Sequence, residues 1–588
     1  MISMLENLRA EMRKMKISAY ILPQTDPHGS EYIAPHWQAI KMLTGFSGSA
    51  ATVVITLKSV ALWTDSRYFL QAEEQLKNTE FQLMKENTEN TPTFVEWLGL
   101  NLKNGEIAAA DGNLFSINNF CNIKNELEKF DIQFKNVDII SNIWQNRPEI
   151  PKEQFFIYKN LNNAQNKLIN SVLPKMEKHK TDLILLTSLD DIAWLFNIRG
   201  FDIQYNPVVI SYAAVDLLEN KGYLFVDFSK INNDVKNEFA KHNYTVFDYN
   251  YFFDYVKKLD NRRIGLDFRK VNFNVKTLIS DSCEVVDFVS PTVLAKAIKN
   301  DDELKELRNA MIKDGVALVK FFRWLENEVP KNCVTELSAS KKLHEFRKEQ
   351  KDFMFESFET ISAYGEHAAI VHYSATEESD VPLKSEGLFL LDSGGQYLDG
   401  TTDITRTVAL GQLSEQQKID YTLVLKGHIA LAKIRFPYGT RGAQLDVLAR
   451  QFLWQNGLNY GHGTGHGVGH FLCVHEGPQS IRTNENPVIL ENGMVTSNEP
   501  GIYRGGKWGI RLENLVVVRN YESNEFGKFM CFETFSLCPF DANCIDFSLL
   551  NNDELEWLNS YHKHVFDELS PYLEKEDLIW LKEKCKFN

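Results

Sequence analysis

The sequence lacks the features that mark secreted, membrane-bound and nucleic-acid-binding proteins. Its eight cysteines are scattered, and no two of them form a Cys-x-x-Cys pair. No apolar run approaches the roughly 18 residues that a membrane span requires. No large basic stretch offsets the formal net charge of −15. These absences predict a cytoplasmic protein with reduced thiols and without a membrane or nucleic-acid partner.

The first 20 residues, MISMLENLRAEMRKMKISAY, mix apolar residues with Glu, Lys and Arg. Because they contain no continuous apolar segment, they predict an amphipathic helix rather than a signal peptide. The acidic surplus of the whole chain fits a cationic or neutral substrate, although many cytosolic proteins share it.

A chain of 588 residues is too long for one hydrophobic core, so two to four domains are expected. The first half contains a diverged internal repeat. The stretches that begin at Ala19 and at Asp182 each predict a strand, a polar turn with Asp, a helix, a Gly-containing turn and a second strand. The later segments GEIAAADGNLFS and RRIGLDFRKVNF are also alike. We therefore predict two copies of one α/β domain, over residues 1–148 and 149–295.

The third predicted domain covers residues 296–588. It opens with a helix for which Asn300 or Asp301 is a plausible N-cap, because acidic residues and then apolar residues at helical spacing follow. From there to about residue 535, Gly-rich turns, strands and helices alternate. A helical extension is expected from about residue 536, and its Trp and Leu side chains are more typical of a core or an interface than of catalysis.

Acidic residues recur at strand and turn positions of this third domain. The stretch LLDSGGQYLDGTTDITRT (390–407) places Asp392 at the end of an apolar strand and Asp403 in an alternating strand, with turn signals between them. SNEPGIY and GIRLENLVVV place Glu499 before a Pro-Gly turn and Glu513 at the centre of another alternating strand. The Gly-rich stretch GHGTGHGVGH supplies His466. Two hairpins would thus bring four carboxylates and one imidazole together.

Four buried carboxylates would repel one another unless cations balance them. Two divalent cations supply the four positive charges required. Oxygen ligands with one imidazole and no thiolate form a hard site, which suits Mn²⁺, Co²⁺, Mg²⁺ or catalytic Zn²⁺ and argues against structural zinc. A single Asp at a strand end is usually a turn or cap residue, but the ordered set of five rarely arises by chance.

In that order, Asp392, Asp403, His466, Glu499 and Glu513 resemble the ligands of the dinuclear metallopeptidases with the pita-bread fold. The sequence is most similar to the long, three-domain form of Xaa-Pro aminopeptidase, through LDSGGQYLDGTTDITRT, GHGTGHGVGH, VHEGPQS, SNEPGIY, GIRLEN, VHYSAT and LWTDSRY. The resemblance covers essentially the whole chain. It implies an α/β protein in which two creatinase-like N-terminal domains precede a pita-bread catalytic domain.

The resemblance also implies roles for individual residues. Asp403 and Glu513 would bridge two metals, Asp392 would complete one site, and His466 with Glu499 would complete the other. Mn²⁺ is the expected metal, with Co²⁺ and Zn²⁺ as alternatives. The remaining candidates are the substrate-contacting His372 and His475, the supporting and proton-shuttling His462, and the substrate-contacting Arg67. The alternative interpretation of Arg67 is an ordinary ion pair at a domain interface.

The implied reaction removes the N-terminal residue from peptides with proline at position two, by attack of a metal-bridging hydroxide with Glu499 as general base. Long members of the family tend to be dimers, so a homodimer is expected. Two other functions stay open from sequence: a prolidase, which cuts only dipeptides, and a metal-free pita-bread binding module. The second α/β domain and the tail favour the aminopeptidase, and the complete ligand set argues against the binding module.

Overall fold

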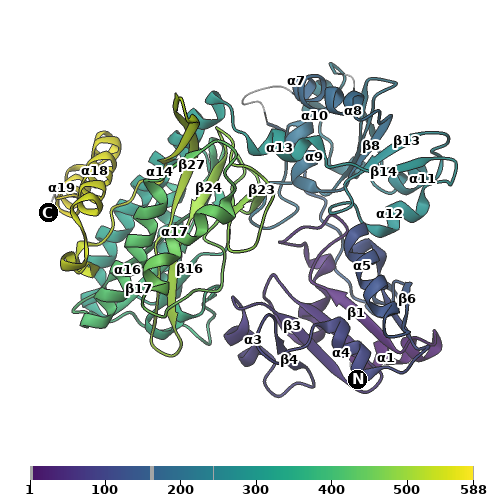
Figure 1. The fold of residues 1–588 in the computed structure, drawn as a ribbon, viewed down its shortest axis with the longest axis horizontal. Helices are drawn as coiled ribbons and strands as arrows, with labels where there is room; N and C mark the ends of the chain where they lie inside the picture. The colour runs from purple at the N-terminus through teal and green to yellow at the C-terminus, as the bar shows by residue number, and fades with distance from the viewer. Residues whose placement is uncertain (1–3, 159–163, 243, 587–588) are drawn as a thin grey trace. The chain divides into compact units, whose positions relative to one another are not determined.

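The structure is a computed structural model that describes residues 4–158, 164–242 and 244–586. The chain divides into two compact units, Met1–Val293 and Leu294–Asn588 (Figure 1). Within the described ranges, none of the helices is both long and apolar enough to cross a bilayer.

The N-terminal unit contains two six-stranded sheets of identical topology. The first has the order β4-β3-β2-β1-β5-β6 and the second β12-β11-β10-β8-β13-β14. In both, the central strand pairs antiparallel on one side and parallel on the other. The strands of the first sheet are β1 (Ala19–Pro23), β2 (Thr52–Thr56), β3 (Val60–Thr64), β4 (Gln82–Lys85), β5 (Ile107–Ala110) and β6 (Gln133–Asn136). Those of the second are β8 (Leu183–Leu186), β10 (Tyr212–Asp216), β11 (Lys221–Phe225), β12 (Tyr244–Phe247), β13 (Arg263–Leu266) and β14 (Glu284–Asp287). The two sheets therefore share one strand order.

Successive side chains of a strand point to opposite faces of the sheet. Hydrophobic clusters cover both faces of the first sheet. Tyr20 and Leu22 of β1 pack in one cluster with the apolar face of the amphipathic helix α1 (Met4–Lys14). Ala19 and Ile21 pack in another with α4 (Phe94–Asn101) and α5 (Ile117–Glu128). In the second sheet the corresponding helices include α9 (Leu189–Phe196), α11 (Tyr251–Lys257) and α12 (Phe273–Leu278).

Helix α13 (Pro291–Ala297) spans the boundary between the two units, and the long helix α14 (Asp301–Glu328) follows in the C-terminal unit. Asn300 is its N-cap: the side chain accepts from the Glu303 N–H, and the Glu303 carboxylate accepts from the Asn300 N–H. This reciprocal pair satisfies two of the backbone donors that every helix start leaves open. Helices α15 (Glu336–Lys348), α16 (Glu415–Ala432) and α17 (Gly442–Trp454) follow in the same unit.

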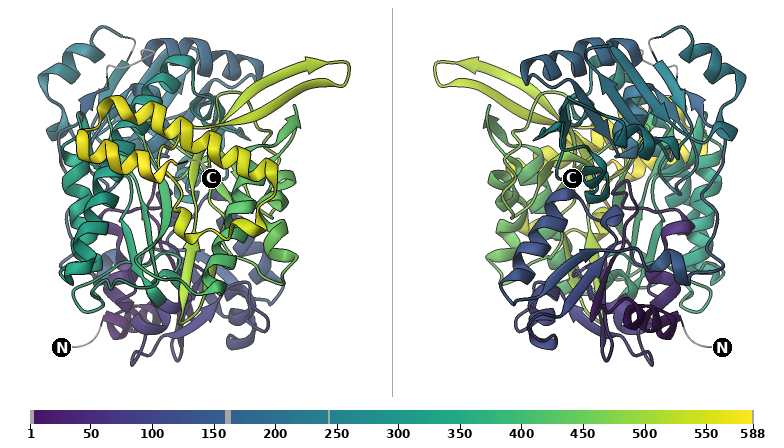
Figure 2. Two further views of the ribbon diagram at one scale, coloured as in Figure 1. Left: turned by 90° about the vertical axis from the view of Figure 1, so that its left-hand side faces the viewer. Right: turned by 90° about the vertical axis from the view of Figure 1, so that its right-hand side faces the viewer.

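Antiparallel sheets form the centre of this unit. One has the order β16-β17-β20, and another, whose edge strands are β21 (Arg435–Pro437) and β23 (Glu476–Ile481), has the order β21-β28-β27-β24-β22-β23, while β25 and β26 form a separate hairpin. The other strands of these two sheets and of the hairpin are β16 (Ile361–Tyr364), β17 (Leu388–Ser393), β20 (Ile404–Ala409), β22 (Gly465–Gly467), β24 (Val495–Asn498), β25 (Gly501–Arg504), β26 (Trp508–Arg511), β27 (Asn514–Asn524) and β28 (Gly527–Thr534). The distal end of the β27–β28 hairpin projects from the unit as a two-stranded arm (Figure 2).

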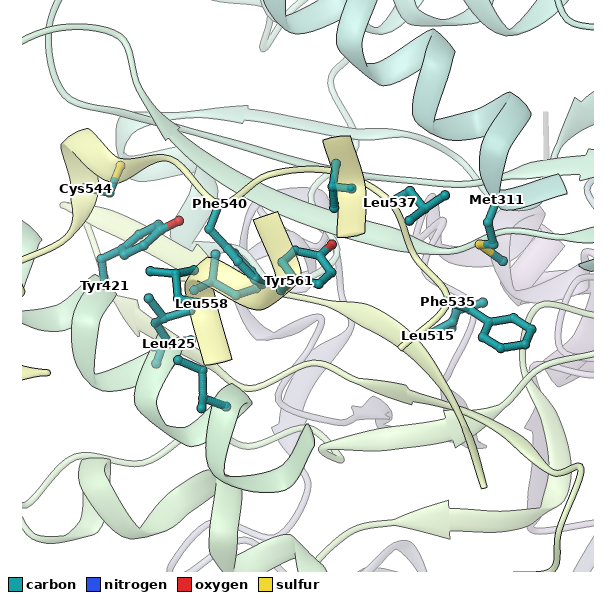
Figure 3. Packing of buried hydrophobic residues seen from close by; sticks show 14 of the residues in the cluster. Met311, Tyr421, Leu425, Leu515, Phe535, Leu537, Phe540, Cys544, Leu558 and Tyr561 are labelled. Carbon is teal, nitrogen blue, oxygen red and sulfur yellow. The ribbon is translucent and has the colours of Figure 1, made fainter. Parts of the chain in front are cut away.

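The C-terminal extension packs on this core through α18 (Asn552–Leu569) and α19 (Lys575–Lys584). Figure 3 shows Leu558 and Tyr561 of α18 among buried side chains of α16 and of the segment that precedes α18. A buried guanidinium joins the extension to the strands: Arg406 of β20 donates to the Cys538 carbonyl at 2.7 Å, the Tyr561 hydroxyl at 2.9 Å and the Glu513 carbonyl at 2.6 Å.

Candidate metal centre

The first hairpin presents two aspartates. β17 pairs antiparallel with β20, and Asp392 lies opposite Thr405. Asp403 stands one residue before β20 begins, and both carboxylates are buried. The hairpin loop carries the short strands β18 (Gly395–Tyr397) and β19 (Gly400–Thr401), so the turn signals of the sequence correspond to a folded loop.

The second hairpin is β25–β26, in which Gly501 lies opposite Arg511. Glu499 precedes this hairpin and Glu513 follows it, so both glutamates stand at its open end. The expectation that Glu513 occupies the centre of a strand is wrong. The chain leaves β26 after Arg511 and enters β27 at Asn514, and between them the Glu513 N–H donates to the Thr405 carbonyl at 3.0 Å. That change of partner carries Glu513 across to the first hairpin.

His466 lies in β22 and faces two of the carboxylates. Its Nδ1 bonds the Gly467 carbonyl at 2.9 Å, which requires a proton on Nδ1. Nε2 then lies 3.4 Å from Asp403 Oδ2 and 3.6 Å from Glu499 Oε1. A ring that donates through one nitrogen to a carbonyl and turns the other toward carboxylates has the orientation of a metal-ligating histidine.

The ligand atoms of Asp403, His466 and Glu513 lie within 4.8 Å of one another. Burial raises the pKa of Asp392, Glu499 and Glu513, and the Asp403 carboxylate adds to each rise. Burial alone would lower the pKa of His466, but the contacts with Asp403 and Glu499 outweigh it and raise that pKa to about 9. The carboxylates therefore hold excess negative charge that the protein itself does not balance.

The donor set fits divalent cations. Asp392 Oδ1 and Asp403 Oδ1 are buried and have no hydrogen-bond partner among the described residues. Buried carboxylate oxygens are ordinarily bonded, so orphaned oxygens that share a site with an imidazole suit an ion that accepts oxygen and nitrogen ligands.

One cation of the chain is already present in the cluster, and the sequence analysis missed it. Arg511 donates to Asp392 Oδ2 at 2.6 Å and to the Tyr503 hydroxyl at 2.7 Å. That hydroxyl lies 2.8 Å from His462 Nε2. Thr405, also missed, donates to Glu513 Oε2 at 2.8 Å. Both missed residues stand two positions from a predicted ligand, Arg511 before Glu513 and Thr405 after Asp403, and this spacing was the available signal.

The remaining candidates occupy different places. The other ring nitrogen of His462, Nδ1, lies 3.8 Å from Glu499 Oε2. The ring of His475 meets that of His466 edge-on, with centroids 4.4 Å apart. His372 is half-buried in the segment that follows β16. Arg67 belongs to the N-terminal unit, where it forms a two-pronged pair with Asp65 through bonds of 2.8 and 2.7 Å.

Comparison with known proteins agrees with this architecture. Residues 305–520 match the model of metallopeptidase family M24, and residues 528–587 match the C-terminal region of that peptidase. Residues 4–143 and 146–303 each match a creatinase/prolidase N-terminal domain. The predicted combination of two creatinase-like domains with a pita-bread domain is thereby confirmed.

Similarity to individual proteins extends over the full length. Xaa-Pro aminopeptidase 1 of Dictyostelium discoideum is 38% identical over 606 residues, covering 99% of this chain and 96% of the relative. The X-prolyl aminopeptidase of Caenorhabditis elegans, described as a cytosolic enzyme with a di-nuclear active site, is 34% identical, with a TM-score of 0.94 and full coverage of both chains. The Xaa-Pro dipeptidase of Bacillus anthracis, at 23% identity and a TM-score of 0.51, shares only the fold, over 64% of this chain and 99% of its own. The chain belongs to metallopeptidase family M24, among the long Xaa-Pro aminopeptidases.

Proposed function

We propose that this chain is an aminopeptidase that releases the N-terminal residue from peptides with proline at position two. The observation that carries the proposal is the four-carboxylate cluster, in a chain whose likeness to Xaa-Pro aminopeptidases runs from end to end. The similarity to the Xaa-Pro dipeptidase of Bacillus anthracis covers only 64% of the chain, and this partial coverage favours an aminopeptidase over a dipeptidase.

Two divalent ions would be held by the five predicted ligands. Asp403 and Glu513 would contact both ions, Asp392 one of them, and His466 with Glu499 the other. Mn²⁺ is the first choice, with Co²⁺ and Zn²⁺ as alternatives, and the di-nuclear site described for the Caenorhabditis elegans relative supports the number. When bound, the ions would supply Lewis acidity and lower the pKa of a water molecule toward about 7.

The chain's own groups would then move protons and hold the substrate. Glu499 is the candidate base, which takes a proton from the attacking water and delivers it to the nitrogen of the departing proline. His462 lies 3.8 Å from Glu499 and is held by the Tyr503 hydroxyl, so it is suited to relay that proton. His372 and His475 would contact the carbonyl oxygen and the amide of the bond that breaks.

Proline explains why a dedicated enzyme is needed. The bond before proline is a tertiary amide without an N–H, and the ring fixes φ, so peptidases that read an extended backbone lose their contacts. A pocket shaped for the ring uses binding energy that other peptidases cannot.

We extend the proposal to the organisation of the chain. The two α/β domains span residues 1–148 and 149–295, and the catalytic domain spans 296–588 with its extension from about 536. Arg67 of the first domain would contact the substrate. The description of the Caenorhabditis elegans relative as cytosolic supports a cytoplasmic location. A homodimer is the proposed assembly.

Chain length of the substrate separates the aminopeptidase from a prolidase. We expect Xaa-Pro tripeptides and longer peptides to be cut once, with release of the free first amino acid. N-acetylated peptides should resist, because the blocked amine can no longer ligate a metal. Replacing the second-position proline by alanine should reduce kcat/KM by roughly 10- to 200-fold. Mass spectrometry of timed digests measures all three, and cleavage of Xaa-Pro dipeptides while every tripeptide stays intact would establish a prolidase instead.

A further inference from the structure

One buried carboxylate of the C-terminal unit that is not a predicted metal ligand gathers three hydrogen-bond donors. Glu336 is the first residue of α15 and its side chain has no solvent exposure. Its carboxylate accepts from the Tyr364 N–H at 2.7 Å, from His367 Nδ1 at 3.0 Å and from the Tyr373 hydroxyl at 2.8 Å. A buried carboxylate is stable only when donors of this kind replace water. We call these four residues the Glu336 clamp.

The three donors come from the beginning, the middle and the end of one segment, residues 364–373. Tyr364 ends β16, His367 lies in the 3-10 helix Gly365–Ala369, and Tyr373 closes the segment. The rings of His367 and Tyr373 also stack, with centroids 4.5 Å apart. One carboxylate therefore fixes the path of a segment that has no strand of its own between residues 365 and 373.

The same segment is fitted against the strand that leads to Glu513. A Cβ built on Gly509 of β26 would lie 1.7 Å from the Ala368 carbonyl oxygen, so the two backbones touch where only glycine fits. The segment is therefore fixed on two sides, by the Glu336 clamp and by β26. His372 stands directly before Tyr373, and anchoring the Tyr373 hydroxyl restricts the backbone that carries the His372 ring.

We infer that Glu336 is a positioning residue, which sets the place of His372 against the peptide bond that is cleaved by anchoring Tyr373. The inference rests on the proposed function, in which His372 contacts the reacting carbonyl. Groups that stabilise developing charge must be held in place before the reaction, because a small displacement reduces kcat while leaving substrate binding nearly unchanged.

The test removes one clamp hydroxyl and leaves the carboxylate in place. In Glu336→Gln an amide NH₂ would face one of the clamp donors, and the variant risks unfolding. Tyr373→Phe is therefore the primary variant. It keeps the ring that stacks on His367. Ser379 Oγ also lies 3.0 Å from the Tyr373 hydroxyl, and because it accepts from the Thr376 N–H at 2.9 Å as well, it keeps a partner in the variant. Tyr364→Phe is the matched control, because its hydroxyl donates to the Glu386 carbonyl at 2.9 Å, outside the clamp.

We expect Tyr373→Phe to lower kcat on an Xaa-Pro tripeptide by about 5- to 20-fold, the loss of one hydrogen bond to a charged group, with KM and bound metal unchanged. Tyr364→Phe should stay within about twofold of wild type. A Tyr373→Phe enzyme with normal kcat, or one that loses metal in proportion to activity, overturns the inference.

A double variant separates positioning from general structural support. If the Tyr373 hydroxyl acts through His372, adding Tyr373→Phe to His372→Ala should cost no further activity. Multiplying effects would show that the clamp only stabilises the fold, and a fully active His372→Ala would show that there is nothing to position. These outcomes differ from failure of the proposed function, in which the metal-loaded wild type itself cleaves no Xaa-Pro peptide and both proposals fall.

Discussion

The two units of the molecule bury carboxylates in different ways. In the N-terminal unit several of them are paired with one cation each: Asp202 contacts Lys230 at 2.7 Å, with both side chains 1% exposed, and Asp216 contacts Arg262 at 2.7 Å. In the C-terminal unit Asp392, Asp403, Glu499 and Glu513 share Arg511 and a histidine. Matched charge is typical of a fold-supporting pair, whereas surplus charge of one sign marks a site that binds something.

The difference belongs to the site and not to the C-terminal unit as a whole. Elsewhere in that unit Asp314 contacts Arg347 at 2.8 Å, and both side chains are buried. Asp446 contacts Arg450 at 2.6 Å in the same manner. The predicted metal centre therefore differs from these paired carboxylates in its surplus of negative charge, and the following experiments compare the two arrangements.

Metal removal should have the largest effect. Exhaustive chelation leaves the four carboxylates unbalanced, and we expect hydrolysis to disappear and to return with Mn²⁺ or Co²⁺. Elemental analysis alongside the assay checks the metal content. Full activity in a preparation shown to be metal-free would contradict a metal centre at this cluster.

The Glu499→Gln substitution should have the second-largest effect. The amide keeps one coordinating oxygen but cannot take a proton, so kcat should fall by at least about 10²-fold with a smaller change in substrate binding. Steady-state kinetics on an Xaa-Pro tripeptide, with metal content determined in the same sample, gives the result. A variant with normal kcat would transfer the role of base to another group.

Breaking a matched pair should affect stability and leave the chemistry intact. Lys230→Met leaves the buried Asp202 carboxylate without a cation and with the Ile210 N–H as its donor at 2.7 Å, and we expect a loss of about 3–5 kcal/mol in unfolding free energy. Urea unfolding measures it. The exposed pair Lys152–Glu149 supplies the control, since Lys152→Met should leave the unfolding free energy nearly unchanged. Equal costs for the two variants would remove the distinction between buried and exposed pairs.

A buried histidine gives a smaller, pH-dependent effect. His562 accepts from the Phe540 N–H through Nε2, and burial with the nearby Arg406 charge lowers its pKa to about 4 from 6.5. The unfolded chain then binds the proton more readily below pH 6.5, so stability falls as the pH drops from about 6.5 toward 4, by about 2 kcal/mol at pH 5. Unfolding curves at pH 7 and pH 5 check this. His562→Gln should flatten the dependence, while His564→Gln, exposed on the same helix, should leave it unchanged.

The smallest effect is expected at Arg67, which has a counterpart in the other α/β domain. Arg67 pairs with Asp65, and Arg269 pairs with Asp267, each two residues away and through two hydrogen bonds. If Arg67 contacts substrate, Arg67→Ala should reduce kcat/KM a few-fold on longer peptides, whereas Arg269→Ala should not. Identical kinetics for both variants on every peptide length would return Arg67 to an ordinary ion pair.

The sequence predicted most of what is encoded locally. The repeated α/β fold, the Asn300 cap and both acidic hairpins follow from alternation, turn residues and capping pairs, which act over a few positions. Glu513 was misplaced within a strand, because its position depends on a bond to Thr405 that local patterning does not reveal. Glu336 was missed altogether, since its partner Tyr373 lies 37 residues away and neither residue is unusual by itself.

The bonds of Arg406 have a consequence for the order in which the protein can be completed. Its partners Cys538 and Tyr561 are synthesised after Glu513, whose carbonyl it also binds. All strands of the two α/β domains are synthesised before residue 538, so these domains can fold during synthesis. Until residues 538–561 have been synthesised, however, the Arg406 guanidinium has the Glu513 carbonyl but lacks the Cys538 carbonyl and the Tyr561 hydroxyl. Arg406 can therefore complete its hydrogen bonds only after the C-terminal extension has been synthesised, later than all five predicted metal ligands.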